Sequence, residues 1–187
     1  MPHRDDARSG GDGTAVDVLS AADASPYRDE VLQVWTEVFG PVADSTEWAA
    51  SLWDRHRSRT DYRLALAHER GTVLGFAWGY TGDRGQYWPD LIARELGPAV
   101  DGWVGGHFEF VELAVHPSAR ARGVGGRLHD ALLSGVTNER ALLSTSADPG
   151  DPAVRLYRSR GWVGLGAYGQ GRQVMGRRLE SPQRLGT

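Results

Sequence analysis

Apolar residues recur along the chain with two different periods. Alternation of apolar with polar or small residues is typical of β-strands, and it predicts strands at 15–19, 62–69, 72–81, 107–115, 140–146, 162–165 and 172–178. Spacings of three and four residues are typical of amphipathic helices, and they predict helices at 26–39, from 44 or 45 onward, at 124–135 and at 153–159. A chain of 187 residues is long enough for one sizeable core, so we expect 14–180 to form a single domain.

The two ends and one internal segment depart from these patterns. Residues 1–13 are polar and rich in Gly, Asp and Arg, which predicts a disordered leader, and we expect a frayed tail over 181–187. The segment 82–106 is rich in aromatic residues and holds a short helical run near 91–96. A long segment of this kind inside a compact domain is often functional, so the segment is expected to be either a lid or substrate wall, or a surface excursion.

One stretch, 111–133, carries a strand, a glycine-rich turn and a helix in that order. The strand ends before Pro117, because proline has no N–H to donate to a sheet, and the helical period begins at Val124. Within the strand the apolar residues change parity near Phe110 or Val111. A change of parity inside one strand predicts a β-bulge at that point.

The turn between this strand and this helix has the composition of an anion site. Three arginines and three glycines lie between residues 120 and 127. Glycine has no Cβ, so a ligand can lie close to the backbone. The N–H groups of the first helical turn point out of the helix without partners, at the positive end of the dipole. Together these features predict a site for a polyanion, most simply a pyrophosphate.

The run Arg120-Ala121-Arg122-Gly123-Val124-Gly125 resembles the Arg/Gln-x-x-Gly-x-Gly/Ala motif of the GNAT superfamily of acyl-CoA-dependent N-acyltransferases. The segment 153–162 resembles a second signature of that superfamily, Asn-x-x-Ala-x-x-Leu/Phe-Tyr-x-x-x-Gly-Phe. Gly150 stands where that signature has Asn, so a polar contact from this side chain to the cofactor is absent. The resemblance implies an α/β fold, with a mixed, mostly antiparallel twisted sheet, splayed central parallel strands and flanking helices.

The same resemblance implies acetyl-CoA as cosubstrate. Backbone groups of the splayed strand are expected to bond the pantetheine arm, and the basic turn is expected to hold the pyrophosphate. The residues that the resemblance assigns to cofactor binding are Leu113, Ala114, Val115, Arg120, Ala121, Arg122, Gly123, Val124, Gly125, Gly126 and Arg127.

Transfer of an acetyl group to an amine needs a base for the amine and an acid for the leaving thiolate. The central strand carries Glu112, Glu109 and His107 as candidate bases. We rank Glu112 first, because Glu112-Leu-Ala-Val resembles the acidic residue before Leu-Ala-Val in aminoglycoside 3-N-acetyltransferases. Glu109 ranks second, by resemblance to histone acetyltransferases. An ion pair of Glu112 with a nearby arginine, serving only to order the strand, is the alternative.

The acid is expected on the second signature. The resemblance assigns Tyr157 as proton donor to the thiolate, since a phenol with a pKa near 10 stays protonated at neutral pH. The alternative is that Tyr157 only packs in the core.

Composition excludes several other kinds of catalytic and binding site. The formal net charge is −3, and the chain has neither cysteine nor lysine. These absences exclude disulfides, thiolate metal sites, a cysteine nucleophile, a Walker-A lysine and a Schiff-base lysine. The charge does not favour nucleic acid or anionic membranes, and the histidines lack a metal-site spacing. We therefore expect that the protein binds no metal, nucleic acid or membrane. We also expect it to be cytoplasmic.

The most direct hypothesis is an N-acetyltransferase that moves an acetyl group from acetyl-CoA to a primary amine by direct attack. A small molecule or a peptide remains open as the acceptor, and a homodimer is compatible with this hypothesis. One rival is a non-catalytic CoA-sensing or protein-binding module of the same fold. A second rival is a phosphate-binding module that is unrelated to CoA.

Overall fold

The computed structural model describes residues 13–180. The predicted leader over 1–13, apart from Gly13, and the predicted tail over 181–187 lie outside the described residues. None of the described helices combines the length and the apolar character that crossing a bilayer requires.

Within the described residues, seven strands form one sheet in the order β1-β2-β3-β4-β5-β7-β6. The strands are β1 (Ala15–Leu19), β2 (Arg63–Glu69), β3 (Thr72–Gly82), β4 (His107–Val115), β5 (Arg140–Ser146), β6 (Val163–Tyr168) and β7 (Arg172–Arg178). Only β4 and β5 pair in parallel, and every other neighbouring pair is antiparallel. The expected mixed, mostly antiparallel α/β fold is therefore confirmed.

The longer helices are α2 (Arg28–Phe39), α5 (Tyr87–Leu96), α6 (Val124–Leu133) and α7 (Pro152–Arg158). The shorter helices and single helical turns are α1 (Ala21–Ala24), η1 (Ser25–Tyr27), α3 (Ser45–Trp48), the π-helical η2 (Ala49–Asp54), α4 (Arg55–Arg57), η3 (Gly97–Val100) and η4 (Pro117–Ala119). Their ends follow local signals: Gly40 at φ +96° follows α2, and the Asp44 carboxylate accepts the N–H groups of Thr46 and Glu47.

Two helices differ from their predicted extents. Helix α6 ends at Leu133, because Gly135 adopts φ +74° and leaves the helix before the expected end. Helix α5 begins at Tyr87, one turn before the expected run near 91–96. Pro89 lies in this extra turn, where the missing N–H of proline costs no intrahelical bond.

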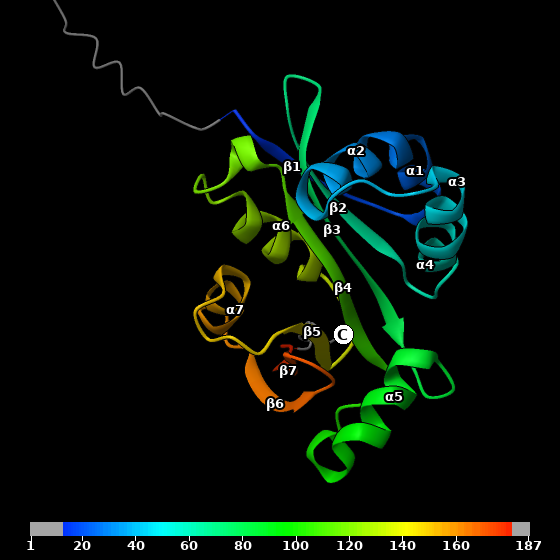
Figure 1. Cartoon of the computed structure of the whole chain (residues 1–187), viewed down its shortest axis with the longest axis vertical. Coiled ribbons are helices and arrows are strands. Elements are labelled where there is room, and N and C mark those ends of the chain that lie inside the picture. The colour runs from blue at the N-terminus through cyan, green and yellow to red at the C-terminus, as the bar shows by residue number, and fades with distance from the viewer. Residues whose placement is uncertain (1–12, 181–187) are drawn as a thin grey trace, which may run out of the picture.

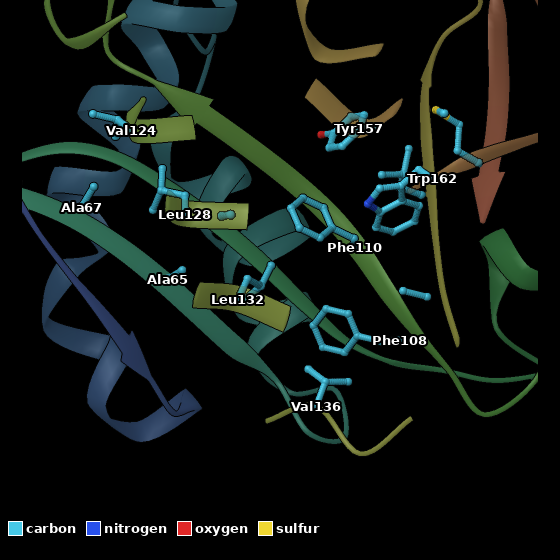
Figure 2. Close-up of a cluster of buried hydrophobic side chains, with 14 of the residues drawn as sticks. Ala65, Ala67, Phe108, Phe110, Val124, Leu128, Leu132, Val136, Tyr157 and Trp162 are labelled. Atoms are coloured by element: carbon cyan, nitrogen blue, oxygen red, sulfur yellow. The ribbon is translucent and has the colours of Figure 1, made fainter. Parts of the chain in front are cut away.

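The helices cover both faces of the sheet (Figure 1). Helix α6 packs on the face formed by small β2 and β3 residues, and Figure 2 shows Leu128 and Leu132 of α6 beside Ala65 and Ala67 of β2. Helices α1 to α4 pack on the opposite face, where the strand residues are large, namely Leu64, Leu66, Phe76 and Trp78. Trp48 and Trp53 are buried on this second face and therefore belong to the core.

The centre of the sheet opens between β4 and β5. Their pairing is limited to Phe108 with Ala141 and Glu109 with Leu142, although both strands continue beyond these residues. The β3–β4 register shifts next to Trp78, so that one β4 residue, Val111, has no partner. This confirms the predicted bulge. The bulge turns β4 away from β5, and one edge of the rest of β4 is left without a strand partner.

The segment 82–106 is anchored to the second half of the sheet. Ile92, Val100 and Val104 are buried against Leu142 of β5 and Val174 of β7. Helix α5 and η3 are therefore an integral part of the fold at the edge of the central opening.

Candidate active site

A cavity of about 280 Å³ lies where β4 and β5 separate. Phe110 and Val111 at the bulge of β4 and Ser144 of β5 lie on its wall, so the cavity reaches the gap between the two strands. The other lining residues are Arg55, His56, Arg59, Tyr80, Gln86, Tyr87, Trp88, Pro89, Glu109, Tyr168 and Arg172. The start of α5 thus forms a wall of the cavity, as one of the two readings of segment 82–106 expected.

Glu109 is the carboxylate that lines this cavity. Its side chain is buried, and one oxygen accepts a 3.0 Å hydrogen bond from the Tyr80 hydroxyl. The other oxygen has no hydrogen-bond partner among residues 13–180. Burial raises the pKa of Glu109 to about 7, although the Tyr80 hydrogen bond and the nearby Arg59 act in the opposite direction. A carboxyl group with this pKa is matched to proton removal near neutral pH.

His107 lies beside Glu109 and does not line the cavity. Its imidazole is fully buried, Nδ1 accepts the backbone N–H of Gly105, and Nε2 lies 4.0 Å from a carboxylate oxygen of Glu109. Burial lowers the pKa of His107 to about 4, and the charge of Arg140 lowers it further. The imidazole is therefore neutral at pH 7, and its Nε2 makes no hydrogen bond to Glu109 or to another described residue.

Glu112 lies beyond the bulge, opposite Trp78 of β3. Because the bulge adds one residue, Glu109 and Glu112 both take the side of the sheet that faces α2 to α4. Glu112 is half-buried, and burial raises its pKa to about 7 against the effects of the Leu113 backbone N–H and Arg172. It does not line the cavity. Glu112 forms no salt bridge within residues 13–180, and Arg172 is the arginine whose charge acts on it.

Tyr157 lies on α7, where the Asp151 carboxylate caps the helix and Pro152 occupies the first position. Its ring packs edge to face against Phe110, with the ring centroids 5.9 Å apart, and lies next to Trp162. Figure 2 shows the hydroxyl on the side of the ring away from Trp162. Burial raises the pKa of Tyr157, and the carboxylates of Glu112 and Asp151 add to this effect. The phenol is therefore held in its protonated form.

The glycine-rich turn has the geometry of an anion site. Gly123 is in the left-handed region at φ +74°, and no side chain caps the first turn of α6. A Cβ on Gly123 would meet no atom of the described residues within 4 Å, so the space beside the start of the helix is open. These uncapped N–H groups and this open space fit a pyrophosphate.

The arginines of this turn are not equivalent. Arg122 donates a 3.0 Å hydrogen bond to the Glu69 carboxylate, and Arg127 donates to the backbone oxygen of Thr14. Arg120 is exposed. Arg122 and Arg127 therefore connect the turn to the β1–β2 side of the sheet.

The remaining cofactor residues predicted from sequence lie on the open edge of β4. Leu113, Ala114 and Val115 pair with β3 and have no partner on β5. Alternate backbone groups of an unpaired edge can bond an extended ligand. This edge runs from the cavity to the start of α6, so it connects the two parts of the site.

Three arginines of the cavity were missed at the sequence level: Arg55, Arg59 and Arg172. The available signal was the i, i+4 spacing of Arg55 and Arg59, which predicts one shared helical face. Arg172 comes from a strand far along the chain, and no local pattern connects it to the other two.

A sequence model of the Acetyltransferase (GNAT) family matches residues 28–162. This match covers most of the chain, so the protein belongs to the GNAT family of acetyltransferases, which use acetyl-CoA. A curated relative is the GCN5-like protein acetyltransferase Rv2170 of Mycobacterium tuberculosis (strain ATCC 25618 / H37Rv), which is 35% identical over 101 residues. That match covers 50% of this chain and 49% of the relative, so the chain aligns with about half the length of Rv2170.

Solved structures share the fold at low sequence identity. PH1933 from Pyrococcus horikoshii OT3 has a TM-score of 0.67 at 15% identity, covering 89% of this chain and 99% of that one. The putative acetyltransferase yncA from Salmonella typhimurium, solved with acetyl-CoA, has a TM-score of 0.58 at 16% identity, covering 90% and 95%. Both likenesses concern the fold.

Proposed function

We propose that the protein transfers an acetyl group from acetyl-CoA to a primary amine by direct attack. The observation that carries this proposal is Glu109, a buried carboxylate with a pKa near 7 and an unpartnered oxygen, at the cavity where β4 and β5 part. The cavity would hold the amine, and the open edge of β4 would bring the acetyl donor to it. Proximity of the two reactants in this gap lowers the barrier to transfer.

Each step has a candidate group in the chain. Glu109, directly or through a water molecule, would take the proton from the ammonium group of the acceptor. Unpaired N–H groups of β4 near the bulge would donate hydrogen bonds to the carbonyl oxygen as it gains charge. Tyr157 would donate its proton to the leaving thiolate. Acetyl-CoA supplies the activated acyl group, and the N-terminus of α6 would hold its pyrophosphate.

Glu112 is the second candidate for the base in this proposal. It is close enough to Tyr157 to raise the pKa of the phenol, so it lies toward the expected position of the leaving group. Glu109 lines the cavity and Glu112 does not, and we therefore rank Glu109 ahead of Glu112 as the base.

An amine panel tests the proposal. Small amines and peptides with free amino groups, including a lysine peptide because the curated relative is called a protein acetyltransferase, are incubated with acetyl-CoA and longer acyl-CoAs. Release of free thiol and the mass of the acylated product are measured. We expect amine-dependent thiol release. A protein that is stabilised by acetyl-CoA but releases no thiol with any acceptor would instead be the non-catalytic module.

Tyr157→Phe should separate chemistry from packing. No described side chain hydrogen-bonds the Tyr157 hydroxyl, so the melting temperature and acetyl-CoA affinity should change little, while kcat should fall about 10²-fold, as for loss of a general acid. Thermal melts and steady-state kinetics at saturating acetyl-CoA measure both. Full turnover by a folded Phe variant would assign Tyr157 to the core alone.

A further inference from the structure

The cavity is positively charged although the chain as a whole is acidic, with a formal net charge of −3. Arg55, Arg59 and Arg172 lie on its wall, against the single carboxylate Glu109. His56 also lines the cavity, and burial lowers its pKa to about 4, so it is neutral at pH 7. Arginines such as Arg28, Arg57 and Arg160 form salt bridges, whereas these three form none within residues 13–180. The charge of Arg59 acts on Glu109 and that of Arg172 on Glu112, and each arginine only lowers the pKa of its neighbouring carboxyl group.

Arg55 is the first residue of α4, and Arg59 lies in the bend that follows the end of this helix. Arg57, which lies between them in the sequence, already has partners within the protein. It forms a salt bridge with Asp54 at 3.2 Å and donates a hydrogen bond to the backbone oxygen of Ala21. Arg59 is partly buried, and its Nε has no hydrogen-bond partner. A buried guanidinium nitrogen without a partner is unfavourable in the free protein. An anion in the cavity would remove this cost.

Arg172 comes from β7 and is held at the cavity by a chain of hydrogen bonds. Its Nε donates to the Ser144 hydroxyl at 2.9 Å, and that hydroxyl lies 2.6 Å from the Tyr168 hydroxyl, which accepts from Trp88 Nε1 at 3.1 Å. These bonds connect β7, β5, β6 and α5. The terminal nitrogens of Arg172 take no part in them, so they remain available to a ligand at a fixed place.

The cavity thus offers two different kinds of group to one ligand. Glu109 suits an amine, and the three guanidinium groups suit an oxyanion, because the guanidinium fork matches the geometry of carboxylates and phosphates. The volume of about 280 Å³ is at the lower end for small-molecule sites, so it suits a compact ligand.

We propose that the acceptor is a small primary amine that also carries an oxyanion, in the simplest case the carboxylate of an amino acid. This proposal rests on the proposed acetyl transfer and adds the chemical class of the acceptor. The amine would lie toward Glu109 and the gap between β4 and β5, and the oxyanion would lie among Arg55, Arg59 and Arg172.

Matched acceptors test this class. Thiol release is followed with ω-aminoalkanoates from glycine upward, with alkylamines of the same length, with aminoalkylphosphonates and with a lysine peptide flanked by aspartates. We expect kcat/KM for the best anionic small amine to exceed that of its neutral counterpart at least about tenfold, as for loss of one charge-assisted hydrogen bond. Carboxylate and phosphonate acceptors then distinguish the two sources of the oxyanion.

Variants connect the preference to the arginines. Arg59→Gln should raise the KM for the anionic amine about 10- to 100-fold relative to the KM for its neutral counterpart, with the KM for acetyl-CoA nearly unchanged. Because the charge of Arg59 lowers the pKa of Glu109, the variant should also move the pH profile of kcat upward for every acceptor, so the two acceptors are compared at about pH 9, where Glu109 is ionised. Arg94→Gln is the matched control, because Arg94 is exposed on α5, pairs with Glu95 and does not line the cavity. Thermal melts verify that both variants fold.

A second readout does not depend on turnover. In the presence of CoA, an N-acetylated ω-aminoalkanoate should raise the melting temperature of the wild-type protein and of Arg94→Gln, and not that of Arg59→Gln. Three results would each overturn the proposal while acetyl transfer stands. They are an equal kcat/KM for neutral and anionic amines, a KM for the anionic amine in Arg59→Gln that equals the wild-type value, and a preference for the acidic peptide. If no acceptor causes thiol release, acetyl transfer itself is contradicted. The shift in melting temperature would then still test whether the cavity binds an oxyanion, because it does not depend on turnover.

Discussion

Glu109→Gln should lower kcat about 10²- to 10⁴-fold, the range for loss of a general base. The amide has nearly the same shape as the carboxylate, and its oxygen can still accept the Tyr80 hydrogen bond, so packing should be kept. In the wild-type protein kcat should rise with pH through about 7, as Glu109 loses its proton. The residual activity of the Gln variant should lack this dependence. Steady-state kinetics between pH 5.5 and about 9 measure both effects.

Glu112→Gln is the matched control, because Glu112 lies on the same strand and its pKa is also raised to about 7. We expect a smaller loss and a retained pH dependence. A larger loss in Glu112→Gln than in Glu109→Gln would restore the order that sequence resemblance favoured.

As the pH rises, the stability contributed by Glu109 should fall while kcat increases. Burial raises the pKa of Glu109 above its ordinary value of 4.5, so the folded state favours the protonated form. The stability that this protonated carboxyl contributes is present below pH 4.5 and is lost as the pH rises through about 7. Glu109→Gln should therefore melt no lower than the wild-type protein at pH 8. A clearly lower melting temperature at that pH would attribute the loss of activity to misfolding.

Gly125→Asp should weaken acetyl-CoA binding at least about 100-fold, because like charges in contact cost several kcal/mol. Gly125 is in the first turn of α6, where we place the pyrophosphate. A Cβ there would meet only ordinary contacts with Val115, Leu156 and Leu113. A carboxylate at a helix N-terminus is itself favourable, so the fold should survive. Acetyl-CoA should no longer raise the melting temperature of this variant.

Gly125→Ala is the control for this substitution. It adds the same Cβ without the charge, and the motif accepts Ala at this position. Its melting temperature should still rise with acetyl-CoA. An unchanged rise in the folded Gly125→Asp protein would contradict a pyrophosphate site at the start of α6.

Local chemistry was sufficient to predict most elements. The β4–turn–α6 unit, the bulge near Val111 and the helix predicted at 153–159 each depend on residues that are near one another in the chain. Such features follow from backbone sterics, capping and hydrophobic period, which neighbouring residues determine. The extent of α5 was less predictable, because its apolar side packs on β5 and β7, which come later in the chain.

The tertiary structure decided which side chains share the cavity. The bulge turns Glu109 and Glu112 to the same side of β4, yet only Glu109 lines the cavity, and this difference depends on where β5 separates from β4. Arg122, expected at the pyrophosphate, is drawn to Glu69 of β2.

The sequence by itself determined most of the strands and helices, the glycine-rich turn before α6 and the membership of the protein in an acetyl-CoA-dependent family. Only the tertiary structure brought Arg59 and Arg172 to the lining of one cavity together with Glu109. The physical reason is that a strand order of β1-β2-β3-β4-β5-β7-β6 places distant segments next to each other, and long-range packing sets that order. No period or spacing along the chain records which distant charges will meet.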